Sequence, residues 1–259
     1  MTELLKGKTG LVTGGGAGIG RAAAQALAGE GARIIVADIE AEGGEETVKL
    51  VRENGGEAEF IRADVTKADE VAALVKETVQ RYGSLDCAFN NAGIFGNPAP
   101  ITETSEEEWY RVIDINLKGV WLCLKYEIEY MLAHGGGSIV NTASTAGLVA
   151  YPRNLTYIIS KHGVLGLTKG VAMAYAAAGI RINAVCPAST RTPMLNTIAG
   201  GNPAAIEGMV ARIPMGRLVE PEEVAAAVVW LCSPAASAVT GHALYVDGGY
   251  LTGNFLAMK

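Results

Sequence analysis

Hydrophobic and polar positions alternate along the chain between two kinds of segment. Short apolar runs rich in valine, isoleucine and threonine indicate strands, and longer stretches with apolar residues three and four positions apart indicate helices. The predicted strands are 9–13, 32–37, 57–62, 85–89, 137–142, 180–185 and 243–246. The predicted helices are 19–28, 41–53, 67–82, 106–132, 157–177 and 222–231.

Nearly continuous apolar strands that alternate with helices indicate a parallel sheet with helices on both faces. Right-handed crossovers then predict a doubly wound α/β fold whose ligand lies at the carboxyl ends of the strands. Because we find no repeat, low-complexity tract or linker, we expect a single domain over residues 1–259. Segment 188–214 breaks the rhythm with prolines and glycines, which predicts a substrate lid or, alternatively, a surface loop.

Composition adds one positive signal, which is an excess of glycine. Glycine accounts for 33 of the 259 residues, about 13% against an average of about 7%. Nine prolines exclude a collagen repeat, and a hydrophobic fraction of 49% excludes a disordered glycine-rich linker. Many positions therefore need a close backbone approach or a positive φ.

Several classes of partner and site are disfavoured. A net charge of −6 argues against nucleic acid, and the longest apolar stretch, 224–232, is about half of what a membrane span needs. The N-terminus resembles no export signal, so we expect a cytoplasmic protein. The four cysteines form no CxxC pair and only three histidines accompany them, so we expect reduced core cysteines and no metal.

A glycine cluster lies between the first predicted strand and the first predicted helix. It reads Thr-Gly-Gly-Gly-Ala-Gly-Ile-Gly over 13–20, and its spacing is Gly14-x-x-x-Gly18-x-Gly20. Gly14 allows a tight turn, Gly18 admits a pyrophosphate close to the backbone, and Gly20 lets the helix pack against the sheet. Glycines also serve ordinary loops and helix packing, but this position predicts a phosphate site at a helix N-terminus.

Two aspartates follow the next two predicted strands. Asp38 lies 18 positions after Gly20, where a dinucleotide fold presents a carboxylate to the ribose 2′-hydroxyl. A carboxylate there repels a 2′-phosphate, and neither Ala17 nor Ile39 supplies a cation, so we predict NAD as the cofactor, not NADP. The alternative is a solvated turn aspartate. Asp64 either caps the following helix or reaches an adenine edge.

Several motifs together resemble the short-chain dehydrogenase/reductase family. They are the loop 13–20, Asn90-Asn91-Ala92-Gly93, Asn116, Ser144, Tyr157-x-x-x-Lys161 and Asp247-Gly248-Gly249, in the family's order and spacing from residue 9 to about 250. The resemblance implies a Rossmann-type seven-stranded sheet, a nicotinamide cofactor and oxidation or reduction at an alcohol or ketone carbon. It also implies a homotetramer. The apolar tail 255–258 either packs against a partner subunit or forms a disordered end.

Tyr157 and Lys161 are four residues apart on a predicted helix and therefore share one face. A nearby ammonium and a cationic nicotinamide favour the phenolate, which lowers the tyrosine pKa from about 10. Ser144 can donate a hydrogen bond to a substrate oxygen. Taken alone, each residue also has an ordinary structural interpretation. The tyrosine and lysine could form a surface pair, and the serine could belong to a turn. The resemblance implies catalytic roles for Ser144, Tyr157 and Lys161, and adds Asn116 as the holder of a water that links Lys161 to solvent.

The remaining cofactor contacts are also implied by the resemblance. Asn90, Ala92 and Gly93 would lie along the adenosine side, and Pro187 and Thr192 near the nicotinamide carboxamide. Ala188 stands where the family usually has glycine, which alters the shape of this pocket. The predicted cofactor-binding residues are Gly14, Gly16, Gly18, Ile19, Gly20, Asp38, Asp64, Val65, Asn90, Ala92, Gly93, Tyr157, Lys161, Pro187, Thr190 and Thr192.

The predicted substrate wall combines apolar and polar side chains. Its residues are Phe95, Ser144, Thr145, Tyr151, Asn154, Tyr157 and Met194. Arg153 either binds a carboxylate or points to solvent. This mixture favours a ring-bearing or medium-sized secondary alcohol or ketone. We therefore expect an NAD-dependent oxidoreductase, with two alternatives: an NAD-binding regulator without turnover, and a non-redox epimerase or dehydratase.

Overall fold

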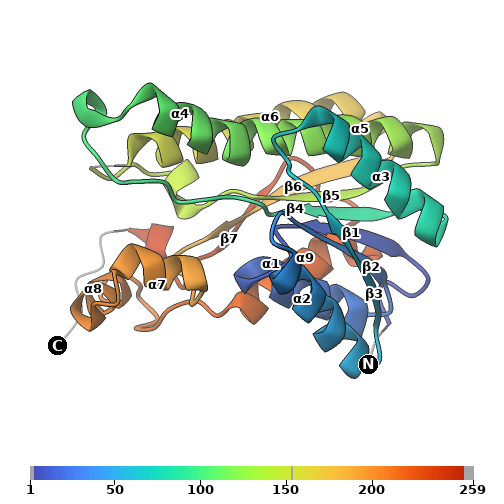
Figure 1. Ribbon diagram of the computed structural model, residues 1–259, viewed down its shortest axis with the longest axis horizontal. Helices are drawn as coiled ribbons and strands as arrows, with labels where there is room; N and C mark the ends of the chain where they lie inside the picture. The colour runs from blue at the N-terminus through green and yellow to red at the C-terminus, as the bar shows by residue number, and fades with distance from the viewer. Residues whose placement is uncertain (1–2, 153, 254–259) are drawn as a thin grey trace.

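The computed structural model describes residues 3–152 and 154–253 and contains a parallel sheet between two layers of helices (Figure 1). The order of the seven strands is β3-β2-β1-β4-β5-β6-β7, which confirms the predicted doubly wound α/β fold. Observed strand ends differ from the predicted ones by at most two residues. The strands are β1 (Thr9–Thr13), β2 (Arg33–Asp38), β3 (Glu57–Arg62), β4 (Cys87–Asn90), β5 (Gly137–Thr142), β6 (Ile180–Pro187) and β7 (Ala243–Val246).

Helices cover both faces of this sheet, as the buried character of the strands predicts. One face carries α1 (Gly18–Gly29), α2 (Ala41–Glu53) and α9 (Pro221–Cys232). The other carries α3 (Ala68–Tyr82), α4 (Glu106–Ile113), α5 (Gly119–Ala133) and α6 (Leu155–Tyr175). No helix of the described residues is long and apolar enough to cross a bilayer.

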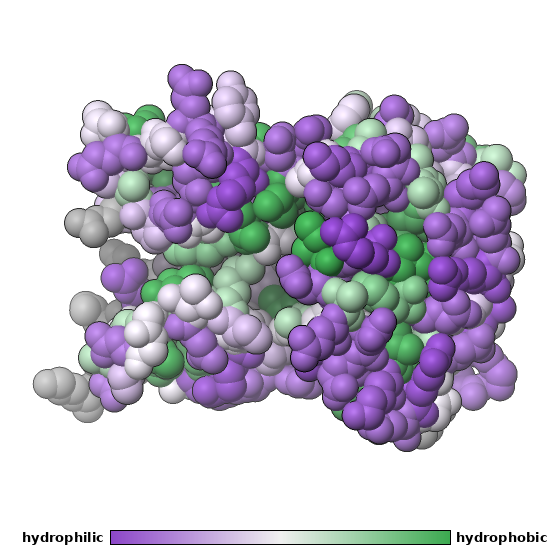
Figure 2. Space-filling model, viewed as in Figure 1, coloured by the Kyte–Doolittle hydropathy of each residue, from purple (hydrophilic) through white to green (hydrophobic). Residues whose placement is uncertain are grey.

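The chain reverses its direction across the sheet between β1 and β4. From β1 it proceeds outward to β3, and from β4 it proceeds the other way to β7. Such a switch point opens a crevice at the carboxyl ends of the strands. Figure 2 shows the surface hollowed on this side of the molecule, beside α7 (Pro193–Ala199) and α8 (Pro203–Val210).

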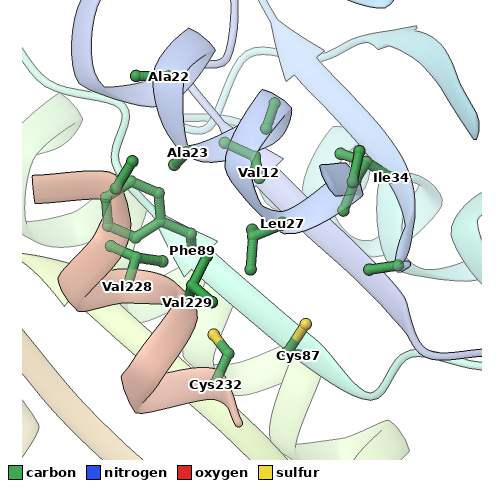
Figure 3. Close-up of a cluster of buried hydrophobic side chains, with 14 of the residues drawn as sticks. Val12, Ala22, Ala23, Leu27, Ile34, Cys87, Phe89, Val228, Val229 and Cys232 are labelled. Carbon is green, nitrogen blue, oxygen red and sulfur yellow. The ribbon is translucent and has the colours of Figure 1, made fainter. Parts of the chain in front are cut away.

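The core explains why the central strands are apolar without interruption. Successive side chains of β1 point to opposite faces, so Leu11 is buried against α5 and α6 while Val12 is buried against α1 and α9. Beneath the sheet, Val12 and Phe89 pack with Leu27 and Val228 (Figure 3). Each large apolar side chain buried there contributes about 1.5–3 kcal/mol to stability. All four cysteines are free and buried, as expected.

The helix predicted over 106–132 is not a regular α-helix throughout. A π-helical turn, η2 (Asp114–Lys118), separates α4 from α5. The apolar pattern of 106–132 predicts one continuous helix and does not resolve this turn. Turns of this kind are frequent at functional sites, and this one contains Asn116.

Segment 188–214 is more regular than its prolines and glycines suggest, since it contains α7 and α8. Pro193 and Pro203 are the first residues of these helices, a position where proline is favoured. The Thr192 hydroxyl accepts a hydrogen bond from the Leu195 N–H at 3.2 Å, which caps α7. Gly200 ends it with a left-handed φ of +60°. The prolines and glycines therefore delimit helices here.

Candidate active site

A cavity of about 580 Å³ occupies the crevice at the strand ends, a size typical of small-molecule sites. Its walls are the glycine loop, the segments after β2 to β6 and the predicted lid. The predicted site residues that line it are Gly14, Gly18, Ile19, Asp38, Asp64, Val65, Ala92, Gly93, Phe95, Ser144, Thr145, Tyr151, Tyr157, Lys161, Pro187, Thr190, Thr192 and Met194.

The glycine loop leaves no room for larger residues. A Cβ on Gly20 would clash with the Gly14 carbonyl oxygen, and one on Gly14 would lie 2.8 Å from Cα of Ala92. Asn91, which our predicted set omitted, lines the cavity and donates from Nδ2 to that same carbonyl at 3.0 Å. Gly16 and Gly20 do not line the cavity and support the loop from behind.

The N-terminus of α1 meets the needs of an anion. The helix begins at Gly18, no side chain caps it, and no acidic residue lies in its first turn. Ala17, Gly18 and Ile19 line the cavity, so the unpaired N–H groups and the positive helix end face it. These residues fit the pyrophosphate of a dinucleotide.

Asp38 and Asp64 define one end of the cavity. Asp38 accepts hydrogen bonds from the Gly16 N–H at 2.9 Å and the Glu40 N–H at 3.0 Å, so its carboxylate is fixed beside the glycine loop. Asp64 accepts from the Thr66 N–H at 2.9 Å, which forms a tight turn before α3. It does not cap the helix itself, whose N-cap is Lys67.

At the other end of the cavity, β5 and α6 bring Ser144, Tyr157 and Lys161 together. The Lys161 Nζ lies 5.6 Å from the centroid of the Tyr157 ring and donates to the Thr142 carbonyl at 2.8 Å. Ser144 follows β5, its Oγ accepts a hydrogen bond from the Ala146 N–H at 3.1 Å, and it lines the same cavity as Tyr157. The predicted helical spacing thus places the phenol and the ammonium on one face, opposite the serine.

Burial dominates the electrostatics of this group. It raises the pKa of Tyr157 above its ordinary value of 10, against a smaller lowering effect of the neighbouring Ser144 hydroxyl. Burial also lowers the pKa of Lys161 to about 8. In the protein without a cofactor the pKa of Tyr157 is thus raised, with desolvation of the phenolate as the largest cause, and the predicted lowering by the ammonium together with a cationic nicotinamide stays a prediction. A further positive charge in the cavity favours the phenolate.

Asn116 is buried beside this group but does not line the cavity. Its Oδ1 accepts from the Ile94 N–H at 2.8 Å, and its Nδ2 donates to the Ile94 carbonyl at 2.8 Å. A Cβ built on Gly93 would lie 3.3 Å from Asn116 Oδ1 and 3.6 Å from Lys161 Nζ. The asparagine thus holds the segment that follows β4 and lies close to the lysine.

Two other predicted residues lie outside the cavity. The Asn90 amide points into the core, where it donates to Glu127 at 3.0 Å, so its side chain is not available to a cofactor. Asn154 caps α6 with a φ of +56° and donates to the Phe95 carbonyl at 2.7 Å. It holds Phe95, whose ring centroid lies 5.0 Å from that of Tyr157. Arg153 and the tail 255–258 lie outside the described residues.

Sequence reasoning also missed part of the cavity wall. Many of the missed residues come from three places: the segment after β4 with the π turn, the segment 188–214, and the turn after β7. Among them are Asn91, Ile94, Ile115, Ser189, Ile198, Met209, Arg212 and Tyr250. The chain within 3–152 and 154–253 offers no group of three or more histidine, cysteine or acidic side chains suited to a metal ion.

Comparisons with known proteins agree over nearly the whole chain. A family model described as enoyl-(acyl carrier protein) reductase matches residues 14–251. A 2,5-dichloro-2,5-cyclohexadiene-1,4-diol dehydrogenase of Sphingobium indicum is 48% identical over 95% of this chain and 98% of its own. A cyclohexanol dehydrogenase of Acinetobacter sp. is 42% identical over 96% and 97%. Among solved structures, a variant of actinorhodin polyketide ketoreductase with NADPH is 40% identical over 94% and 97%, with a TM-score of 0.91.

Proposed function

The chain belongs to the short-chain dehydrogenase/reductase family of oxidoreductases, and from this premise we propose that it interconverts a ring-bearing secondary alcohol and its ketone with NAD. The observation that carries the proposal is the meeting of Ser144, Tyr157 and Lys161 in the cavity that the glycine loop also lines. A site suited to an anion and a group able to transfer a proton thus lie in the same cavity.

The three side chains divide the work on the substrate. Ser144 hydrogen-bonds the substrate oxygen as charge develops on it. Tyr157 takes the hydroxyl proton during oxidation and returns it during reduction, and Lys161 stabilises the phenolate by its charge. NAD, when bound, supplies the acceptor or donor of the hydride at its nicotinamide C4.

Proton exchange with solvent falls to Asn116 and Lys161. Both the Asn116 Oδ1 and the Lys161 Nζ lie within 3.6 Å of one point, the Cβ position built on Gly93. This proximity supports a water held between the two side chains. Lys161 also contacts the ribose of the nicotinamide in the proposed complex.

The preference for NAD rests on Asp38. Its carboxylate lines the cavity beside the glycine loop, where it can bind two ribose hydroxyls and repel a 2′-phosphate. Among described residues, the only lysine or arginine side chains in the cavity wall are Lys161 and Arg212, which belong to the β5 and β6 side. The related ketoreductase was solved with NADPH, so a direct comparison of NAD with NADP is the required test.

A ring-shaped substrate is supported by the character of the cavity and by the relatives. Apolar side chains line the part of the cavity formed by the segment after β4 and by segment 188–214. They are Phe95, Met194, Ile198 and Met209. Two relatives are named for activity on a cyclohexadiene diol and on cyclohexanol. We propose that the segment 188–214 closes over such a ring and excludes water from it.

The test is a panel of cyclic secondary alcohols with NAD, followed by the absorbance of NADH. Steady formation of NADH with ring alcohols is the expected result. Binding of NAD without turnover of any alcohol or ketone would favour the regulator alternative. Conversion of substrate without net NADH would favour an epimerase or dehydratase.

We also propose that the enzyme is a homotetramer. Large apolar side chains are exposed on α5 and α6, among them Trp121, Leu132, Ile159 and Met173. Covering such a surface by a second copy of the chain removes it from water. Sedimentation equilibrium measures the mass directly, and a monomer would overturn the proposal. A cytoplasmic location stays a prediction of the sequence.

A further inference from the structure

Arg212 differs from the other arginines near the predicted lid. Arg191 pairs with Glu220 at 3.1 Å, and Arg217 pairs with Glu223 at 2.7 Å. Arg212 forms no ion pair with any residue in the described ranges and lines the cavity beyond the end of α8. Arg212 is an exposed residue and, among the residues that the structure describes, the one lysine or arginine of segment 188–214 that lines the cavity.

The charge of Arg212 is not balanced by the cavity itself. The acidic residues that line the cavity are Asp38 and Asp64, at the ends of β2 and β3. Within the described ranges, neither carboxylate forms an ion pair with Arg212. The charge of Arg212 is therefore left for an anion that enters the cavity.

Other residues of the same cavity wall are suited to the body of a ring. Ile198 lies on α7, Met209 on α8, and Tyr250 follows the turn after β7. Tyr151 lies in the same wall, and burial raises its pKa, so it stays a neutral phenol. This part of the cavity therefore combines apolar and neutral walls with one cation.

Resting on the proposed function, we propose that Arg212 binds a carboxylate on the ring substrate, at the end away from the carbon that reacts at Tyr157. The substrates are then ring hydroxy acids and the matching keto acids, and neutral ring alcohols are poorer. A guanidinium is planar and presents two parallel N–H donors, which match a carboxylate. Closure of the lid over the ring removes water from this pair and strengthens it.

The dinucleotide phosphates are the other anions that enter this cavity. They are already provided for by the N-terminus of α1, where uncapped N–H groups face the cavity. A role for Arg212 toward the cofactor predicts that its loss weakens NAD with every substrate. A role toward the substrate predicts a loss that depends on the carboxylate.

The experiment compares cis-4-hydroxycyclohexanecarboxylate with cyclohexanol as substrates of the wild type, Arg212→Gln and Arg212→Lys. The expected result is a wild-type preference for the acid and a fall of roughly tenfold in the ratio of the two kcat/KM values in Arg212→Gln, mainly through KM. Arg212→Lys should retain part of the preference. Arg217→Gln, which removes the same charge outside this cavity, should retain all of it.

Binding of cyclohexanecarboxylate to the enzyme with NAD, measured by calorimetry, gives a readout that needs no turnover. Weaker binding to Arg212→Gln than to the wild type is expected. Equal binding, no wild-type preference for the acid, or an increase in the KM for NAD with both substrates would each overturn the role of Arg212. Absence of turnover with both alcohols would instead contradict the proposed function, and calorimetry would still test Arg212.

Discussion

Replacing Glu127 with glutamine should stabilise the protein at pH 8 and change its stability little at pH 5. Glu127 lies on α5 and is fully buried, and burial raises the pKa of its carboxyl to about 7, against a smaller opposing effect of the Asn90 hydrogen bond. Its Oε2 accepts from Asn90 Nδ2 at 3.0 Å. Within the described residues, its Oε1 and the Asn90 Oδ1 have no partner. A protonated carboxyl, or an amide in its place, carries a hydrogen-bond donor that the carboxylate lacks.

The magnitude follows from the difference between the folded and unfolded pKa values. The carboxyl titrates near 4.5 when unfolded and near 7 when folded, which corresponds to ~3 kcal/mol. Between these values the folded state holds a proton that the unfolded state has released. The free energy of unfolding therefore falls by about that amount from pH 4.5 to 7 and is constant above. Glutamine stays neutral, so the variant lacks this fall.

The assay is urea unfolding at pH 5, 6, 7 and 8 and at one protein concentration, because association of subunits also affects stability. Glu129→Gln is the control, since Glu129 is exposed on the same helix. Its profile should follow that of the wild type. Parallel profiles for the wild type and Glu127→Gln, or a variant that is less stable at pH 8, would refute the reasoning.

Three further substitutions test the cofactor and substrate ends of the site. Asp38→Ala removes a carboxylate that repels the 2′-phosphate of NADP, so the ratio of kcat/KM with NADP to kcat/KM with NAD should rise by roughly tenfold or more. An unchanged ratio would contradict the role of Asp38 in selecting NAD. Gly20→Ala forces a Cβ against the Gly14 carbonyl oxygen, so NAD binding measured by fluorescence should weaken at least ~10-fold while circular dichroism reports the fold. Asn154→Ala removes the α6 cap that also holds Phe95, so it should lower the free energy of unfolding in urea by about 1–2 kcal/mol and raise the KM for ring alcohols. An unchanged KM would argue against a role of Asn154 in positioning Phe95 for the substrate.

The sequence predicted most of the architecture because apolar strands and glycine spacing are local signals. The strand β1 and the loop 13–20 are predicted with little error, since both depend on residues next to one another in the chain. What the sequence missed depends on contacts distant in the chain. Asn90 and Asn91 are adjacent, yet one amide faces the core and the other the cavity.

The sequence also did not reveal three other features. The π turn around Asn116 is held by the backbone of Ile94, 22 residues away. In α7 and α8 the miss is local, because the proline and glycine positions of segment 188–214 predict breaks whereas in the structure they mark helix ends. The pKa of Tyr157 depends on burial, which the i, i+4 spacing with Lys161 does not report.

The central claim is that Tyr157 transfers the proton in an NAD-dependent oxidation of a ring alcohol. The most direct measurement is NADH formation from cyclohexanol by the wild type and by Tyr157→Phe, together with the Kd for NAD of both proteins. We predict turnover by the wild type, a loss of at least ~100-fold in kcat for the variant, and a Kd for NAD that changes by less than ~3-fold. Equal kcat values for the two proteins would contradict the account.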